Sequence, residues 1–302
     1  MKRFILFSAL CLAACTGEAP TPADPAAEKG RPLVIASNYP LYFFASELSG
    51  GTADLRLPDI EGDPALWVPD GEQVAELQAA DRILLNGAGY ESWLDFVTVP
   101  EDRLLDTTAN LGERLLAQEE TTVHRHGPEG EHSHAGTAFT TWLDPELAAE
   151  QARVIAGALS ALQPQRVSDI AARLAELEAR LAQLDRELRQ AFDGLQGAPV
   201  IFSHPVYQYL QRRYGINGRS LHWEPDEAPG VQAWLDFQNM LRGHPARLLI
   251  WEGEPAAETT GKLREAGVES LVFEPAANRP EQGDYFDVMA SNLAALRQSA
   301  PD

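Results

Sequence analysis

The sequence is poor in thiols, in basic residues and in long apolar runs. Only two of its 302 residues are cysteines, Cys11 and Cys15, so the chain beyond them can hold neither a disulfide nor a thiolate-bound zinc ion. Lysine and arginine total 24 against 45 aspartates and glutamates, and the formal net charge is −21. This charge argues against the basic footprint of a nucleic-acid-binding protein and against electrostatic docking on anionic lipid.

The signatures of common enzyme classes are also missing. The chain has no nucleophile elbow, P-loop, dinucleotide-binding glycine pattern or HExxH helix. Ser203 and His204 are adjacent, so in a strand they would point to opposite faces and could not act as a nucleophile and its base. We therefore expect a protein that is not an enzyme. Its hydrophobic content of 44% and mean hydropathy of −0.25 indicate a soluble globular fold.

The amino terminus has the pattern of an export signal. Lys2 and Arg3 precede an apolar run over residues 4–12, which is too short to span a membrane as a helix. The run ends in Leu12-Ala13-Ala14-Cys15, which resembles a bacterial lipobox. The resemblance implies a lipoprotein signal peptide over residues 1–14 and lipidation of Cys15. An ordinary signal peptide that contains a cysteine is the alternative.

A tether is expected after this cysteine. Residues 15–31 are rich in proline, alanine and small polar residues, which cannot build a core. From residue 32 onward, short apolar runs alternate with helix-like segments, a pattern that predicts mostly parallel sheets flanked by helices. We expect strands at 33–36, 53–57, 82–87, 199–202, 247–251 and 271–273. We expect helices at 42–48, 71–79, 145–162, 206–214, 258–266 and 287–297.

One further helix is expected to be much longer. Between residues 165 and 192, apolar residues recur at alternating steps of four and three, and at ~1.5 Å per residue the helix would be about 40 Å long. A dimerising coiled coil and a strut packed along two lobes of one chain would both use such a stripe. Proline before it and Asp193-Gly194 after it favour the strut. The stripe consists of Ile170, Leu174, Leu177, Leu181, Leu184 and Leu188.

These patterns predict an α/β fold of two lobes, each with a mostly parallel sheet flanked by helices, joined by one long rigid helix. The predicted boundaries are residues 32–163 for the N-terminal lobe, 164–196 for the linking helix and 197–302 for the C-terminal lobe. Small-molecule sites in such proteins lie at the C-terminal ends of strands, in the crevice between lobes.

Four of the seven histidines fall within eleven residues, in the segment HRHGPEGEHSH. Neutral imidazole is a common ligand of zinc and copper. Gly127-Pro128 and Gly130 indicate a mobile loop, which we expect to capture zinc weakly; a polar loop without a metal role is the alternative. The four residues are His124, His126, His132 and His134.

Other segments match a known pattern in the same order along the chain. Two of these segments are Trp142-Leu143-Asp144-Pro145 and Ser203-His204. The others are Ala80-Asp81 through Asn86-Gly87, Glu91 with Trp93-Leu94, Tyr209, Tyr214-Gly215, and Asp284-Tyr285 through Asn292-Leu293. Together they resemble the zinc- and manganese-binding proteins of ABC transporters, the cluster A-I family. The matches span about residues 33–297. The resemblance implies two α/β lobes joined by one rigid helix, with metal held between them.

The ligands implied by this resemblance are only partly present. The family's first ligand is the histidine of an Asp-Pro-His segment, which here reads Asp63-Pro64-Ala65, and its second is a histidine where this chain has Thr140. Neither alanine nor threonine is a good zinc ligand. The third ligand position is His204, and the fourth corresponds to Glu274. The C-terminal lobe is therefore expected to keep a histidine and a carboxylate.

Two more residues are candidates for completing the site. His222 and Glu224 would lie on one face of an extended segment, although the family does not use this segment for metal. The resemblance implies a structural role for Glu252, and His244, which precedes Pro245, is expected to be exposed. The candidate metal ligands are His204, Glu274, His222 and Glu224.

The sequence thus predicts a lipid-anchored, periplasmic solute-binding protein of an ABC uptake system. Its expected cargo is zinc in preference to manganese, and its expected partners are a permease with its ATPase. It is expected to be monomeric and to bind no nucleic acid. Because Ala65 and Thr140 replace two histidines, a metal-buffering or chaperone lipoprotein and a binder of a metal chelate or another small solute remain alternatives.

Overall fold

The computed structural model describes residues 30–299 except 61, 63, 119–122, 126–130 and 134–135. The predicted signal peptide, Cys15, most of the tether and two of the loop histidines, His126 and His134, lie outside the described residues. A compact unit begins at Arg31, next to the expected start of the folded domain. None of the described helices is long and apolar enough to cross a membrane.

Four parallel strands form a sheet in the N-terminal half of the chain, in the order β2-β1-β3-β4. They are β1 (Leu33–Ala36), β2 (Asp54–Arg56), β3 (Arg82–Leu85) and β4 (Leu104–Asp106). The apolar run of β1 is buried because it lies in the centre of this sheet. The strands at 33–36, 53–57 and 82–87 are confirmed, whereas β4 was not predicted.

Two helices lie in the connections between the strands of this sheet: α1 (Tyr39–Ser49) follows β1, and α2 (Gly71–Ala79) precedes β3. The Asn38 side chain accepts the Leu41 amide and starts α1 three residues earlier than expected. Short 3-10 turns follow in the connecting loops; they are η2 (Pro64–Leu66), η3 (Ser92–Asp95), η4 (Glu101–Arg103), η5 (Gly112–Arg114), η7 (Thr141–Leu143) and η8 (Pro164–Arg166).

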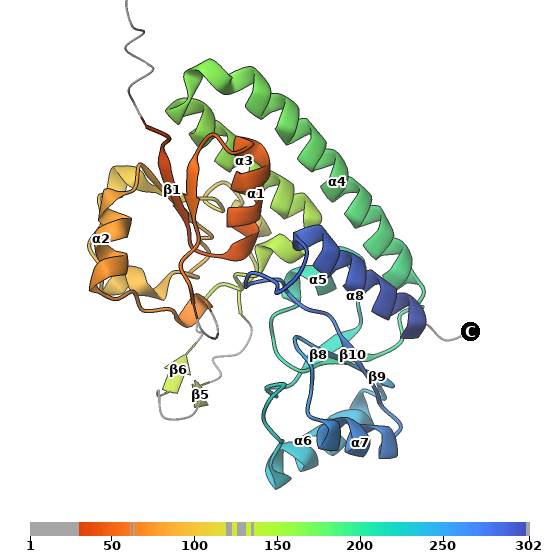
Figure 1. The fold of residues 1–302 in the computed structure, drawn as a ribbon. Helices are drawn as coiled ribbons and strands as arrows, with labels where there is room; N and C mark the ends of the chain where they lie inside the picture. Colours follow the sequence, from red (N-terminus) through yellow and green to blue (C-terminus); the bar gives the residue numbers. More distant parts are fainter. Residues whose placement is uncertain are drawn as a thin grey trace, which may run out of the picture. The chain divides into compact units, whose positions relative to one another are not determined.

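The long helix α4 (Val167–Asp193) follows α3 (Pro145–Leu162) and η8. It contacts α1 and α3 of the N-terminal half and α5 and α8 of the C-terminal half (Figure 1). Five residues of its apolar stripe are fully buried and Leu174 is partly buried. The stripe is therefore covered within this chain, which confirms the strut.

The C-terminal half contains a second sheet of four parallel strands, in the order β10-β9-β7-β8. Its strands are β7 (Val200–Phe202), β8 (Gly218–Ser220), β9 (Leu248–Trp251) and β10 (Glu269–Val272). Its helices are α5 (Gln208–Tyr214), α6 (Val231–Gly243), α7 (Ala257–Glu265) and α8 (Tyr285–Ser299). The predicted fold of two parallel sheets joined by one long helix is thus confirmed, although β8 and α6 were not predicted.

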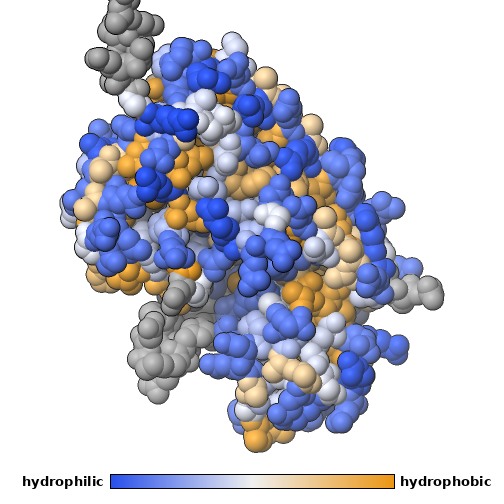
Figure 2. All heavy atoms as spheres, viewed as in Figure 1, coloured by the Kyte–Doolittle hydropathy of each residue, from blue (hydrophilic) through white to orange (hydrophobic). Residues whose placement is uncertain are grey.

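One apolar core continues through both halves. Trp142, Leu181, Ile250 and Tyr285 belong to the same cluster of buried residues. Hydrophilic residues cover most of the face that Figure 2 shows, as the charge of −21 predicts.

One expectation was wrong. His244 was expected to be exposed but is buried, because its Nε2 lies 2.9 Å from the carbonyl of Val200 and that contact replaces hydration. The described parts of the histidine-rich segment contain an antiparallel pair, β5 (Val123–Arg125) and β6 (Glu131–Ser133).

Candidate functional site

A cavity of about 850 Å³ lies where the loops after the parallel strands of both halves meet. Trp142, in η7, and Thr140, which directly precedes η7, line the cavity from the N-terminal half. His204, Glu252 and Glu274 line it from the C-terminal half, and each follows the end of a strand by one or two residues. A cavity therefore lies at the ends of the strands, where the alternation of strands and helices predicts a site.

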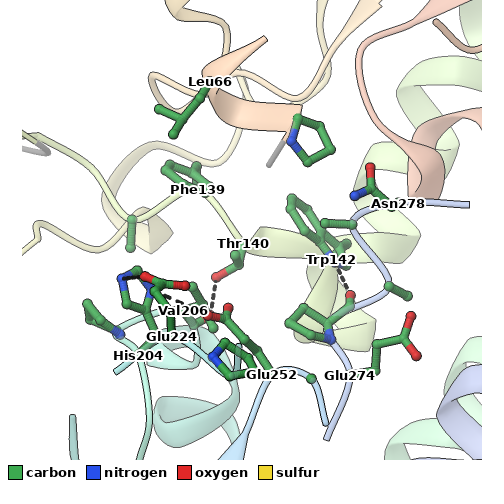
Figure 3. Close-up of a pocket in the computed structure, with 18 of the residues that line it drawn as sticks. Leu66, Phe139, Thr140, Trp142, His204, Val206, Glu224, Glu252, Glu274 and Asn278 are labelled. Atoms are coloured by element: carbon green, nitrogen blue, oxygen red, sulfur yellow. Dashed lines mark hydrogen bonds and ion pairs between the residues drawn. The ribbon is translucent and has the colours of Figure 1, made fainter. Parts of the chain in front are cut away.

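His204 lies on the C-terminal wall beside Glu224 (Figure 3). Its Nε2 lies 3.6 Å from Glu224 Oε1 and its Nδ1 lies 4.0 Å from Glu252 Oε1. All three side chains are mostly buried, with 16%, 26% and 20% of their surface exposed. In this arrangement two carboxylates face the two ring nitrogens of one imidazole.

The loop after β8 brings two predicted residues beside His204. Leu221 and Trp223 are buried in the core, whereas His222 and Glu224 are partly buried and alternate with them. The His222 ring lies edge-on to that of His204, with centroids 5.7 Å apart, but His222 does not line the cavity. The expected common face therefore exists, although strand β8 ends at Ser220. Burial lowers the pKa of His222, which favours its neutral form.

Glu274 follows β10 and is fixed through its backbone. Its amide donates to Asn292 Oδ1 at 2.9 Å, and Asn292 Nδ2 donates to its carbonyl at 2.8 Å. Burial raises the pKa of the Glu274 carboxyl. Glu274 shares the cavity with His204, but no contact joins the two side chains in Figure 3.

The cavity is strongly acidic on this side. Among its described lining residues there are six carboxylates and neither a lysine nor an arginine. A concave surface with one sign of charge concentrates counter-ions, so the cavity favours cations. The carboxylates are Glu224, Asp226, Glu227, Glu252, Glu254 and Glu274.

The N-terminal wall has a different character. Its described residues are apolar, aromatic or neutral: Pro64, Leu66, Tyr90, Gln118, Ala138, Phe139, Thr140 and Trp142. The Thr140 hydroxyl donates to the carbonyl of Val206 at 2.5 Å, which joins the two walls. Ala65 is buried between Pro64 and Leu66 and is not itself a lining residue.

Several side chains fix the two walls relative to each other. Trp142 Nε1 donates to the carbonyl of Pro275 at 2.7 Å (Figure 3). The Tyr209 hydroxyl donates to the carbonyl of Ala138 at 2.7 Å and accepts the Leu116 amide at 3.1 Å. These hydrogen bonds join residues of the N-terminal half to residues of the C-terminal half.

Glu91 supports the N-terminal wall from behind. Its carboxylate accepts the Ser37 hydroxyl at 2.6 Å and the amides of Asn86 and Gly87 at 2.6 and 3.0 Å. Burial raises the pKa of Glu91 to about 7, although these three hydrogen bonds act in the opposite direction. The Glu91 carboxylate thereby holds the loop that precedes Tyr90, and Tyr90 lines the cavity.

The structure brings together only part of the predicted site. In the described ranges, no group of three or more histidine, cysteine, aspartate or glutamate side chains is arranged to hold a metal ion. In the histidine-rich segment, His124 and His132 are paired in register on β5 and β6, and His126 and His134 are not described. The assignment of metal ligands therefore stays a prediction.

Four acidic residues of the cavity were not among the predicted metal ligands. Glu252 was expected to be structural, but it faces the Nδ1 of His204. Asp226, Glu227 and Glu254 were not considered, although they also line the cavity. Glu252 and Glu254 could have been found from their position just after β9, since the ends of parallel strands meet at one edge of a sheet.

Known zinc-binding and zinc-uptake proteins are similar to this chain along nearly its whole length. The chain is 25% identical to the zinc-binding lipoprotein AdcA of Streptococcus pneumoniae over 99% of its own length and 61% of that protein. It is 25% identical to the high-affinity zinc uptake system protein ZnuA of Bacillus subtilis, covering 98% of this chain and 96% of that protein. The chain thus spans about three fifths of the length of AdcA.

Solved structures show the same fold. The crystal structure of the Zn(II)-bound ZnuA-like domain of Streptococcus pneumoniae AdcA superposes with a TM-score of 0.74 at 21% identity, covering 90% of this chain and all of that domain. A sequence model of the family described as "Zinc-uptake complex component A periplasmic" matches residues 34–299. The chain therefore belongs to the family of periplasmic components of zinc-uptake complexes.

Proposed function

We propose that this protein captures zinc in the cavity between its two halves and delivers it to the permease and ATPase of an uptake transporter. The observation that carries the proposal is the partly buried imidazole of His204, which has a carboxylate facing each ring nitrogen in a cavity rich in carboxylates. Imidazole and carboxylate are zinc ligands, and the surrounding negative charge attracts a dication. The names of the relatives, which are zinc-binding and zinc-uptake proteins, support zinc as the cargo.

His204 and Glu224 are the proposed first ligands. Two ligands of a tetrahedral zinc ion with bonds of ~2.0 Å lie about 3.3 Å apart, and the 3.6 Å between His204 Nε2 and Glu224 Oε1 is close to this value. Glu252 faces the other ring nitrogen, where a carboxylate typically orients a metal-bound histidine. Glu274 and His222 are the remaining candidates for completing the site.

The histidine-rich segment has a separate proposed role. Four imidazoles in eleven residues supply ligands that can capture zinc before it enters the cavity. We propose that Cys15 anchors the protein by lipid on the periplasmic side of a bacterial membrane, as the lipobox-like segment and the lipoprotein relatives suggest.

Zinc titration of the purified protein tests the proposal. The four loop histidines are replaced by asparagine, so that the cavity is measured alone. His204→Ala should then abolish the tight binding phase, and Glu224→Gln should weaken it because one ligand loses its charge. Glu252→Gln should lower affinity by about 10–100-fold, the cost of removing the partner of a metal-bound histidine.

Glu265→Gln is the matched control, because Glu265 is exposed on α7 and does not line the cavity. It should bind zinc like the parent. If His204→Ala and the control bind zinc alike, His204 is not a ligand and the proposal fails. If the protein with asparagine at the loop histidines binds no zinc while the unmodified protein does, the protein is a metal buffer that uses its histidine-rich segment, which is the second candidate function.

A further inference from the structure

We propose that Thr140 and Trp142 are positioning residues that hold His204 and Glu274 at the separation at which both bind one zinc ion. This inference rests on the proposed function, because it concerns the same site. It follows from two hydrogen bonds through which one short segment of the N-terminal half contacts two loops of the C-terminal half (Figure 3).

The first of these bonds holds the loop that carries His204. The Thr140 hydroxyl donates to the carbonyl of Val206 at 2.5 Å, and the amide of Val206 donates to the carbonyl of His204 at 2.9 Å. His204 and Val206 therefore belong to one tight turn, so a shift of Val206 also moves the backbone of His204. The start of this turn is fixed to the sheet, since the Ser203 amide donates to the carbonyl of Ile250 at 2.8 Å.

The second bond holds the loop that carries Glu274. Trp142 Nε1 donates to the carbonyl of Pro275, one residue after Glu274, at 2.7 Å. On the other side, the Asn292 side chain pairs with both the amide and the carbonyl of Glu274. The backbone around Glu274 is thus held from both halves of the chain, where Glu274 lines the cavity.

The two bonds have a fixed spacing. Thr140 directly precedes the 3-10 turn η7, and Trp142 lies within it. The Leu143 amide donates to the carbonyl of Thr140, and the Asp144 amide donates to that of Thr141, at 3.1 Å each. Thr140 and Trp142 are 4% and 1% exposed, so close packing restricts their side chains. The turn therefore acts as a rigid spacer between the two loops.

A fixed separation matters because the ligands of one zinc ion must meet at one point. Bonds from zinc to imidazole nitrogen or carboxylate oxygen are about 2.0–2.2 Å long, and a donor displaced from this distance binds less well. Donors that are already held in place also lose less conformational freedom when the metal binds. Thr140 and Trp142 act in this way through the two loops and not as ligands themselves.

The test is zinc titration by calorimetry on the protein with asparagine at the four loop histidines. Thr140→Val nearly keeps the shape of the side chain but removes the donor, and Trp142→Phe removes the indole N–H. Each should lower zinc affinity by about 10-fold or more, as expected when a group that orients a metal ligand is removed. Thr140→Ser keeps the hydroxyl and should bind zinc nearly as tightly as the parent.

Tyr209→Phe separates positioning from general contact between the two halves. Its hydroxyl also joins the halves, because it donates to the carbonyl of Ala138 at 2.7 Å, but Tyr209 lies on α5 and in neither loop. Tyr209→Phe should therefore lower zinc affinity less than Thr140→Val does. An equal loss in both variants would show that any hydrogen bond between the halves has this effect, and would overturn the inference.

Double substitutions identify the ligand through which each residue acts. Glu274→Gln should by itself weaken zinc binding. In that background Trp142→Phe should have little further effect, because the carboxylate that it positions is absent. Thr140→Val should keep its full effect there, because it acts through His204. A loss from Trp142→Phe that is the same with and without the Glu274 carboxylate would contradict positioning of Glu274.

The failure of this inference differs from the failure of the proposed function. If His204→Ala abolishes the tight phase but Thr140→Val and Trp142→Phe bind zinc like the parent, the inference fails and the proposed function stands. The inference also fails if Glu274→Gln binds zinc like the parent. If His204→Ala binds zinc like the parent, both fail together. Should Trp142→Phe not fold, Thr140→Val and Thr140→Ser decide the inference.

Discussion

Replacing Glu91 with glutamine should change how the stability of the protein depends on pH. Glu91 is 8% exposed, and its carboxylate accepts hydrogen bonds from the Ser37 hydroxyl and from the amides of Asn86 and Gly87. Burial nevertheless raises its pKa from 4.5 to about 7 in the folded protein. Glutamine has nearly the same shape and cannot ionise, so it removes the titration with little change in packing.

The size and direction of the effect follow from this pKa. One pKa unit corresponds to about 1.36 kcal/mol, so the difference between the folded and unfolded states is worth about 3 kcal/mol. Between pH 4.5 and 7 the folded protein binds more protons at Glu91 than the unfolded chain does. The contribution of Glu91 to stability is therefore complete below pH 4.5, falls as pH rises, and is lost above pH 7.

The assay is urea unfolding of the parent and of Glu91→Gln at pH values from 5 to 8. We expect the stability of the parent to fall relative to that of the variant by about 2.5 kcal/mol across this range, because part of the total difference is already lost below pH 5. Glu101→Gln, which changes an exposed glutamate, should follow the parent. Parallel curves for the parent and Glu91→Gln would show that Glu91 is ionised in the folded protein throughout, and would refute the reasoning.

Three further predictions concern the rest of the chain. Leu181→Ala should lower the free energy of unfolding by about 2–5 kcal/mol, because Leu181 is 1% exposed in the core along α4. Glu176→Ala, on the exposed side of α4, should change it little. Equal effects of the two substitutions in urea unfolding would count against the strut. Cys15→Ser should move the protein from the membrane to the soluble fraction, and a variant that stays membrane-bound would contradict lipid anchoring. Replacing the histidines of segment 124–134 with asparagine should reduce the number of zinc ions bound per chain above pH ~6.5. The replacement should have no effect well below this pH, because imidazole is then protonated. Unchanged stoichiometry by calorimetry would exclude a role for this segment.

The sequence predicted the fold well where its patterns are long. Apolar stripes and runs identified α3, α4 and the central strands, because a helix of 27 residues or a buried central strand leaves a clear periodicity. The edge strands β4 and β8 were missed because neither contains an apolar run: β4 has two apolar residues and β8 has none. The buried position of His244 could not be predicted either, since it depends on a contact with Val200, 44 residues away.

The site was predicted less completely than the fold. His204, Glu224 and Glu274 were expected in the cleft, and all three line it. The contact of Glu252 with His204 was not expected, because it depends on how β7 and β9 pair in space. The replacement of two imidazoles by Ala65 and Thr140 could be read from the sequence, but the apolar wall that accompanies it could not.

The most direct test of the central claim is to locate zinc in crystals of the zinc-loaded protein by anomalous scattering at the zinc absorption edge. We expect an anomalous difference peak within about 2.1 Å of His204 Nε2, bound also by Glu224 and facing the wall formed by Leu66 and Phe139. A peak confined to the histidine-rich segment 124–134, with none beside His204, would contradict zinc capture between the two halves.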